Sequence, residues 1–152
     1  MRIEASRFLS DEPGAQGSLF PSAKPGVVVF IQFSHIEGDE FTEVVRLAQP
    51  SFVFDLRIAP RFDVGNLNRR TAFALFDEVK ATYVDATTPL MMGEQRESAV
   101  QRFREAIAKI DLCRPLFFLF GSDKGSIISD SEVLNILASA GKPAADLVVL
   151  PT

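Results

Sequence analysis

The sequence predicts a three-layer, doubly wound α/β fold, in which helices cover both faces of a mostly parallel sheet of about five strands. From Val27 onward, apolar runs alternate with amphipathic runs, which is the order of βαβ units. Two apolar runs, 27–33 and 115–121, contain almost no polar residue, as expected for strands that helices cover on both faces. At 152 residues, the chain suits one such domain and is too short for two.

Residues 1–26 are expected to form an N-terminal arm, and residues 27–152 a single α/β domain. No element of more than a few residues fits between the closely spaced turn formers of the arm. They are Pro13, Gly14, Gly17, Pro21, Pro25 and Gly26.

The first half of the domain predicts three strands and two helices. The strand 27–33 is rich in β-branched and aromatic residues, and its lack of polar residues predicts a central position. Gly38 opens a helix that Pro50 ends, with apolar residues at helical spacing and acidic residues in the first turn. The segment 51–56 is the second strand. A further amphipathic segment, with Ala72, Phe73, Phe76 and Val79 on its apolar side, then precedes a short strand at 82–84.

The second half predicts two helices and two strands. Residues 95–110 place their apolar side chains in one stripe, and the apolar segment 115–121 follows. The sequence Ser129-Asp130-Ser131-Glu132 has the S-x-x-E pattern of a capping box, which predicts a helix start, and Gly141 predicts its end. The segment 146–150 completes the sheet.

Charge and composition narrow the classes of partner. With 16 basic and 20 acidic residues, the net charge of −4 leaves no basic excess for non-specific binding to nucleic acid or anionic membranes. The apolar runs are far shorter than the roughly 20 residues that span a bilayer. The start of the chain does not have the basic-then-apolar pattern of a signal segment, and the single Cys113 excludes an intramolecular disulfide. We therefore expect a cytoplasmic protein.

Polar residues follow the predicted strands at their carboxyl ends, where doubly wound sheets bind ligands. Asp55 and Arg57 follow the second strand, and strand alternation sends both to the same face. Asp55 could hold the guanidinium in place, and Arg57 or Arg61 could then bind a phosphate or carboxylate. The alternative is an ion pair that only ties the strand to its loop. In that case, substitution of Arg57 changes stability rather than ligand affinity, and an interaction module replaces the enzyme hypothesis.

His35 is the only histidine, and it follows Ser34 at the end of the first strand. It is therefore the one imidazole available for acid or base chemistry near neutral pH, and with Asp55 it forms the candidate catalytic pair. We expect it to lie near Arg57 if the first two strands are neighbours. A histidine bonded to the backbone is the alternative. Zinc needs three or four protein ligands, so no zinc site is predicted, while a magnesium site with Asp55, Asp85 and Asp123 stays open.

A glycine-bounded polar loop, residues 121–126, follows the fourth strand. Its backbone N–H groups could hold an anion, with Ser122, Asp123 and Lys124 as candidate ligand-binding residues. The loop matches neither the P-loop pattern nor the G-x-G-x-x-G pattern, so no nucleotide cofactor is predicted. Polar turn and cap residues are also ordinary at such positions.

Residues 28–90 resemble the bacterial domain of unknown function 488 family. The resemblance rests on an apolar strand ending in Phe33-Ser34-His35, the element F-D-L-R-x-x-P-R-F, and a later strand that contains a tyrosine. It implies that His35 takes the family's histidine position and that Tyr83 takes the aromatic position of the third strand. Asp55, Arg57, Pro60 and Arg61 fall on the family's D-x-R-x-x-P-R element. The family's C-terminal cysteine-histidine-arginine cluster has no counterpart here, and the resemblance therefore implies a similar fold rather than a known activity.

Two functions follow as hypotheses, and neither decides whether the protein is an enzyme. The first is the binding or processing of a small anionic ligand, with Tyr83 among the ligand-binding residues. The second is a non-catalytic interaction module, because Gln16, Leu19 and Phe20 resemble the Q-x-x-L-F peptides that dock on the bacterial sliding clamp. An arm that packs on its own domain is the alternative. The 14 phenylalanines also suggest a homodimer, if some of Phe41, Phe73, Phe76 and Phe103 are left on the surface.

Overall fold

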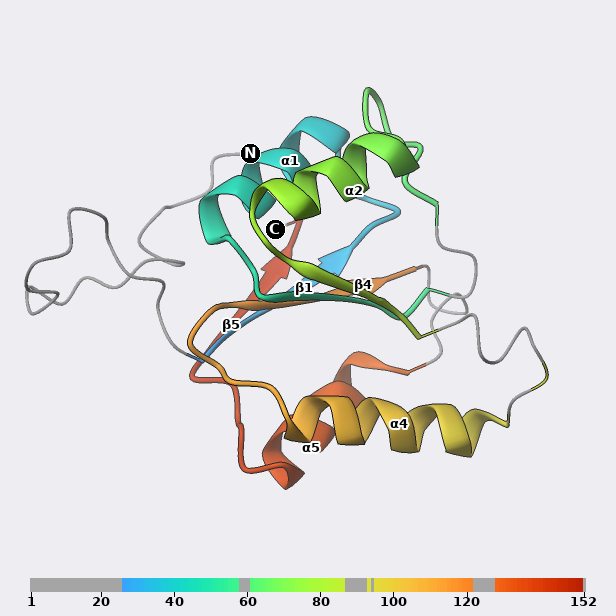
Figure 1. Ribbon diagram of the computed structural model, residues 1–152, viewed down its shortest axis with the longest axis vertical. Coiled ribbons are helices and arrows are strands. Elements are labelled where there is room, and N and C mark those ends of the chain that lie inside the picture. Colours follow the sequence, from blue (N-terminus) through green and yellow to red (C-terminus); the bar gives the residue numbers. More distant parts are fainter. Residues whose placement is uncertain (1–25, 58–60, 87–92, 94, 122–127, 152) are drawn as a thin grey trace, which may run out of the picture.

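The structure is a computed structural model that describes residues 26–57, 61–86, 93, 95–121 and 128–151. A five-stranded sheet with all strands parallel separates two helical layers (Figure 1), so the predicted fold class is confirmed. The strands are β1 (Val27–Gln32), β2 (Phe52–Asp55), β3 (Thr82–Asp85), β4 (Leu116–Phe120) and β5 (Asp146–Leu150). The helices are α1 (Gly38–Ala48) and α2 (Arg69–Glu78) on one face, with α4 (Arg96–Ala108) and α5 (Asp130–Ser139) on the other.

The strand order is β3-β2-β4-β1-β5, so β1 and β2 are not neighbours, and the condition under which His35 was expected near Arg57 is not met. The crossover through α1 carries the chain past one strand position, and β4 later fills that position. Phe118 of β4 is in register with Phe30 on one side and Phe54 on the other. β4 suits this central place because all five of its residues are buried and apolar.

Strand alternation divides the interior into two apolar cores. The side chains of Val29, Ile31 and Phe117 face α1 and α2, whereas those of Phe30 and Phe118 face α4 and α5. These two cores also hold the phenylalanines of the described residues. Phe41, Phe76 and Phe103 are buried and Phe73 is half-buried, so the expected surplus of exposed rings is not present. Within the described ranges, Val149 is the only large apolar residue classed as exposed.

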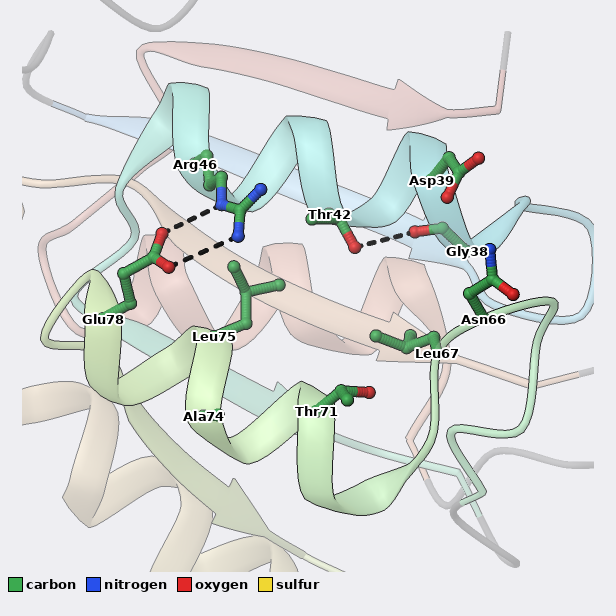
Figure 2. A pocket seen from close by; sticks show the side chains of 10 residues that line it. All are labelled: Gly38, Asp39, Thr42, Arg46, Asn66, Leu67, Thr71, Ala74, Leu75 and Glu78. Atoms are coloured by element: carbon green, nitrogen blue, oxygen red, sulfur yellow. Dashed lines mark hydrogen bonds and ion pairs between the residues drawn. The ribbon is translucent and has the colours of Figure 1, made fainter.

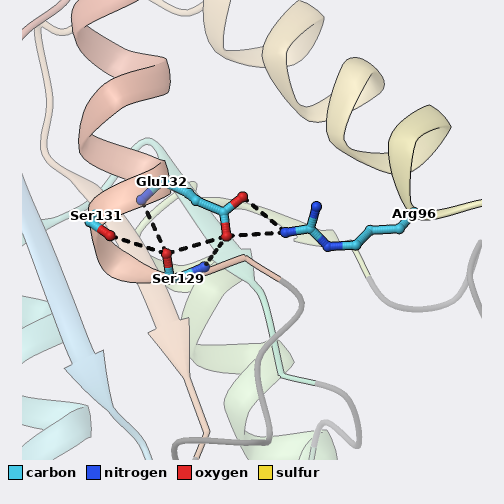
Figure 3. Close-up of polar contacts among 4 residues, drawn as sticks. All are labelled: Arg96, Ser129, Ser131 and Glu132. Carbon is cyan, nitrogen blue, oxygen red and sulfur yellow. Dashed lines mark hydrogen bonds and ion pairs between the residues drawn. The ribbon is translucent and has the colours of Figure 1, made fainter.

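The capping box predicted at the start of α5 is present (Figure 3). The Ser129 hydroxyl accepts the Glu132 backbone N–H at 3.2 Å, and the Glu132 carboxylate accepts the Ser129 backbone N–H at 3.3 Å. Arg96, the first residue of α4, donates to the same carboxylate at 2.9 and 3.0 Å. Glu132 therefore joins the first turns of two neighbouring helices. Its pKa is lowered, chiefly because Arg96 hydrogen bonds to the charged form.

None of the helices in these ranges has the length and apolar character needed to cross a bilayer.

Candidate functional site

A buried ion pair joins Asp55, at the end of β2, to Arg57. Arg57 Nε donates to Asp55 Oδ1 at 2.8 Å, and Arg57 Nη2 donates to Asp55 Oδ2 at 2.6 Å. The Arg57 backbone N–H also donates to Oδ1, at 3.1 Å. Asp55 has no exposed surface and Arg57 is 6% exposed. The pairing expected from strand alternation is therefore present, and it lies inside the protein.

Two phenylalanine rings contact the guanidinium. Arg57 Cζ lies 4.3 Å from the centre of the Phe33 ring and 4.8 Å from the centre of the Phe62 ring. The two ring centres are 5.4 Å apart, with an edge-to-face arrangement. Such contacts attract a cation to the aromatic faces and partly replace its lost hydration. Arg57 Nη1 also donates to the Arg61 carbonyl oxygen at 2.6 Å, which ties the guanidinium to the backbone at Arg61.

Tyr83 of β3 completes this polar cluster. Its hydroxyl donates to Asp55 Oδ2 at 2.6 Å, so the carboxylate accepts four hydrogen bonds in all. Burial raises the pKa of Tyr83 far above its ordinary value, and the negative charge of Asp55 raises it further. The tyrosine is therefore held neutral as a hydrogen-bond donor, and its hydroxyl already has a partner within the protein.

The cluster connects the carboxyl ends of β1 and β2 with the side chain of Tyr83 from β3. Phe33 follows β1, Asp55 ends β2 and Tyr83 lies in β3, while β4 separates β1 from β2. The Phe33 backbone N–H donates to Phe120 O and the Leu56 backbone N–H donates to Leu119 O, both at 3.0 Å. The loops after β1 and β2 therefore start on either side of β4 and meet through the Phe33 and Phe62 rings.

Exposed polar residues adjoin this aromatic contact in the chain. Ser34 and His35 follow Phe33, and Arg61 precedes Phe62; all three are exposed. Among the described residues, no side-chain hydrogen bond or ion pair occupies His35 or Arg61. A ligand at this edge can therefore reach these residues, whereas it cannot reach the Asp55 carboxylate.

Three of the predicted ligand-binding residues, Ser122, Asp123 and Lys124, lie outside the described residues, as do Gln16, Leu19 and Phe20 of the arm. Within the described ranges, no group of three or more His, Cys, Asp or Glu side chains could hold a metal ion. Both oxygens of Asp55 are already engaged by Arg57 and Tyr83, so this residue does not fit the hypothetical magnesium site.

A separate groove of about 270 Å³ lies between α1 and α2, and the sequence reasoning did not identify it (Figure 2). At one end, Arg46 pairs with Glu78 at 2.9 Å, and Asp39 lies at the other. The arginine charge is neutralised within the groove, and the remaining charge is acidic. This groove therefore does not suit an anion, unlike the edge of the sheet near Arg61.

Sequence reasoning also missed the roles of Phe33 and Phe62. The available signal was that each phenylalanine is adjacent to a candidate polar residue, Phe33 to Ser34 and Phe62 to Arg61. Apolar residues at such positions are usually assigned to the core, and these two do lie in the core while they also contact a cation.

Comparison with models of known protein families finds no match to this sequence, and comparison with curated proteins finds none either.

Proposed function

We propose that the protein binds a small anionic ligand at the carboxyl edge of its sheet, above the end of β4. Arg61 supplies the charge, and Ser34 and His35 supply hydrogen bonds from the opposite side. The observation that carries the proposal is the mutual contact of Phe33, Arg57 and Phe62, which brings the residues after β1 and β2 together across β4.

The strand order supports this location. The helices after β1 and β2 lie on one face of the sheet, and the helix after β4 lies on the other. Adjacent strands whose connections leave on opposite faces create a crevice at their carboxyl ends, where doubly wound proteins bind ligands. By this rule the proposed ligand lies beside Gly121, the residue after β4, between Ser34-His35 and Arg61.

Asp55, Arg57 and Tyr83 act as positioning residues in this proposal. Asp55 orients Arg57, and Arg57 holds the carbonyl oxygen of Arg61, so the backbone that carries the exposed guanidinium is fixed before the ligand arrives. Fixed donors lose less conformational entropy on binding. Asp55 and Arg57, which were expected to organise the site, are buried and paired with each other. The proposal is therefore binding without catalysis.

Isothermal titration calorimetry with inorganic phosphate and acetate tests the proposal, supported by thermal shift in the same buffers. A bound anion should raise the melting temperature as its concentration exceeds the dissociation constant. We expect Arg61→Ala to weaken binding at least about tenfold, because a charge-assisted contact is lost. The matched control is Arg104→Ala, an exposed arginine on α4. The proposal is overturned if neither probe binds, or if Arg61→Ala binds as tightly as the control.

A non-catalytic protein-interaction module is the second candidate. It is favoured by the inward pairing of Asp55 with Arg57, which removes both residues from direct ligand chemistry. The test is a pull-down with purified bacterial sliding clamp. Capture that Leu19→Ala combined with Phe20→Ala abolishes would support the module, and capture unchanged by this pair would exclude the docking peptide.

We also propose a cytoplasmic location. The support is the exposed Cys113, the only cysteine of the chain, because a thiol without an intramolecular partner is ordinary in a reducing compartment. We also propose a relationship to the domain of unknown function 488 family, which rests on the motifs of residues 28–90.

A further inference from the structure

Three exposed arginines, Arg61, Arg69 and Arg70, lie in the loop after β2 and the first turn of α2; we call them the arginine cluster. In the part of the chain that the structure describes, none of them forms an ion pair. The segment 61–70 holds one acidic residue, Asp63, against these three cations, in a chain whose net charge is −4. The cluster is therefore a local positive region on an acidic protein.

Phe62, one of the two rings that contact Arg57, also links Arg57 to Arg69 of the cluster through Phe73. The Phe62 ring packs against the Phe73 ring with centres 5.9 Å apart, and Arg69 Cζ lies 4.6 Å from the centre of the Phe73 ring. Arg61 is adjacent to Phe62 in the chain. Arg61 and Arg69 therefore lie on either side of one continuous aromatic contact that begins at the candidate site.

The charges of Arg69 and Arg70 do not favour the helix dipole at the start of α2. α2 has no acidic residue in its first turn, where a positive charge is unfavourable to the helix dipole. The other three described helices each have at least one acidic residue in this turn. The start of α2 is instead stabilised by the capping box of Asn68 and Thr71, which leaves both arginine side chains exposed.

We infer that the ligand carries two linked phosphate groups. Arg61 binds one phosphate beside Ser34 and His35, and Arg69 and Arg70 bind the second. Guanidinium groups match phosphate oxygens in bidentate pairs, and a second phosphate group gives Arg69 and Arg70 a partner of their own. This inference rests on the proposed function and narrows its ligand class from small anions to diphosphates.

Calorimetric titration of the full chain with inorganic pyrophosphate and with inorganic phosphate, at low ionic strength, tests the inference. We expect pyrophosphate to bind at least about tenfold more tightly than phosphate. In the variant with Arg69→Ala and Arg70→Ala, pyrophosphate should bind no more tightly than phosphate. Arg61→Ala should weaken the binding of both probes.

Arg104→Ala serves as the control for a change in net charge alone, and urea denaturation shows whether the double variant is folded. Equal affinity of the wild-type protein for the two probes would overturn the inference and leave the proposed function standing. An unchanged preference for pyrophosphate in the double variant would also overturn it. If neither probe binds the wild-type protein, the proposed function and the inference both fail.

Discussion

At the scale of single residues, several contacts offset the free-energy cost of burying the Arg57 guanidinium. Asp55 provides the opposite charge, the Arg61 carbonyl oxygen accepts a further N–H, and two aromatic rings cover the guanidinium. Removing one member of a buried ion pair leaves the other charge without a partner, which is far more costly than the net contribution of the intact pair.

Arg57→Met should therefore destabilise the protein strongly, by about 3 to 5 kcal/mol, because the Asp55 carboxylate stays buried without its cation. The free energy of unfolding in urea measures this. Arg46→Met is the matched control, since Arg46 pairs with Glu78 in an exposed ion pair and should change stability much less. Similar losses in the two variants would show that the Asp55–Arg57 pair does not have the structural role assigned to it.

Tyr83 should stay protonated in the folded protein at a pH where free tyrosine ionises. Its raised pKa means that, above about pH 10, the unfolded chain releases the phenol proton while the folded chain keeps it. The folded state then binds more protons than the unfolded state, so stability should fall as the pH rises through that region. Tyr83 is the only tyrosine and the chain has no tryptophan, so the phenolate absorbance reports this residue alone.

Other groups also titrate in this pH range, and Tyr83→Phe is the control for them. The variant should lack the part of the pH dependence of stability that comes from Tyr83. Formation of phenolate near pH 10 while the far-ultraviolet circular dichroism is still native would contradict the buried hydrogen bond to Asp55.

At the scale of elements, Arg114 holds the carboxyl ends of α1 and α2 together. Its guanidinium donates to Gln49 O at 3.0 Å, to Pro50 O at 2.9 Å and to Val79 O at 2.6 Å. We expect Arg114→Ala to cost about 2 kcal/mol of unfolding free energy, since these carbonyl oxygens lose a charged donor at the negative ends of two helices. Arg114→Lys should restore part of the loss. Urea denaturation compares the variants, and an unchanged midpoint in Arg114→Ala would contradict this role.

Gly38, the first residue of α1, approaches the turn before α2 too closely for any side chain. A Cβ atom at this position would lie 2.2 Å from the Val64 carbonyl oxygen, a backbone atom that cannot rotate away. Gly38→Ala should therefore destabilise the protein by roughly 1 to 3 kcal/mol through overpacking. Helix propensity alone predicts that Gly38→Ala stabilises the protein, because alanine favours the helix more than glycine does. Thermal denaturation of Gly38→Ala, with Asp39→Ala at the exposed neighbouring position as the control, distinguishes overpacking from helix propensity. A higher melting temperature for Gly38→Ala than for the wild-type protein would contradict the close contact with Val64.

At the scale of the whole molecule, the sequence predicts the layers better than the order of the strands. Runs such as 27–33 and 115–121 show that both faces of a strand are covered, and Ser129-Asp130-Ser131-Glu132 gives the start of a helix. The periodicity of a strand predicts which face of the sheet each side chain points to, but it does not predict which strand is the neighbour. The position of β4 between β1 and β2 depends on the route of a later crossover, which no local pattern records.

The candidate site was predictable to a similar extent. Alternation placed Asp55 and Arg57 on one face, because a period of two is a local property. The contact of Arg57 with Phe33 and Phe62 was not predictable, because it joins loops on either side of β4. Phe41, Phe73, Phe76 and Phe103, the rings that suggested a homodimer, lie in or against the two cores, and the homodimer itself stays a prediction.

The central position of β4 also governs when the sheet can form during synthesis. By the time α2 and β3 have been translated, β1 and β2 have no partner between them, because the strand that joins them begins only at Leu116. A chain that ends before this residue should not form the native sheet and should be digested rapidly by protease, whereas the full chain should resist. Folding on the ribosome is therefore expected to be late and nearly all-or-none, and protease resistance of stalled nascent chains measures it. Resistance acquired before β4 leaves the exit tunnel would contradict this order of events.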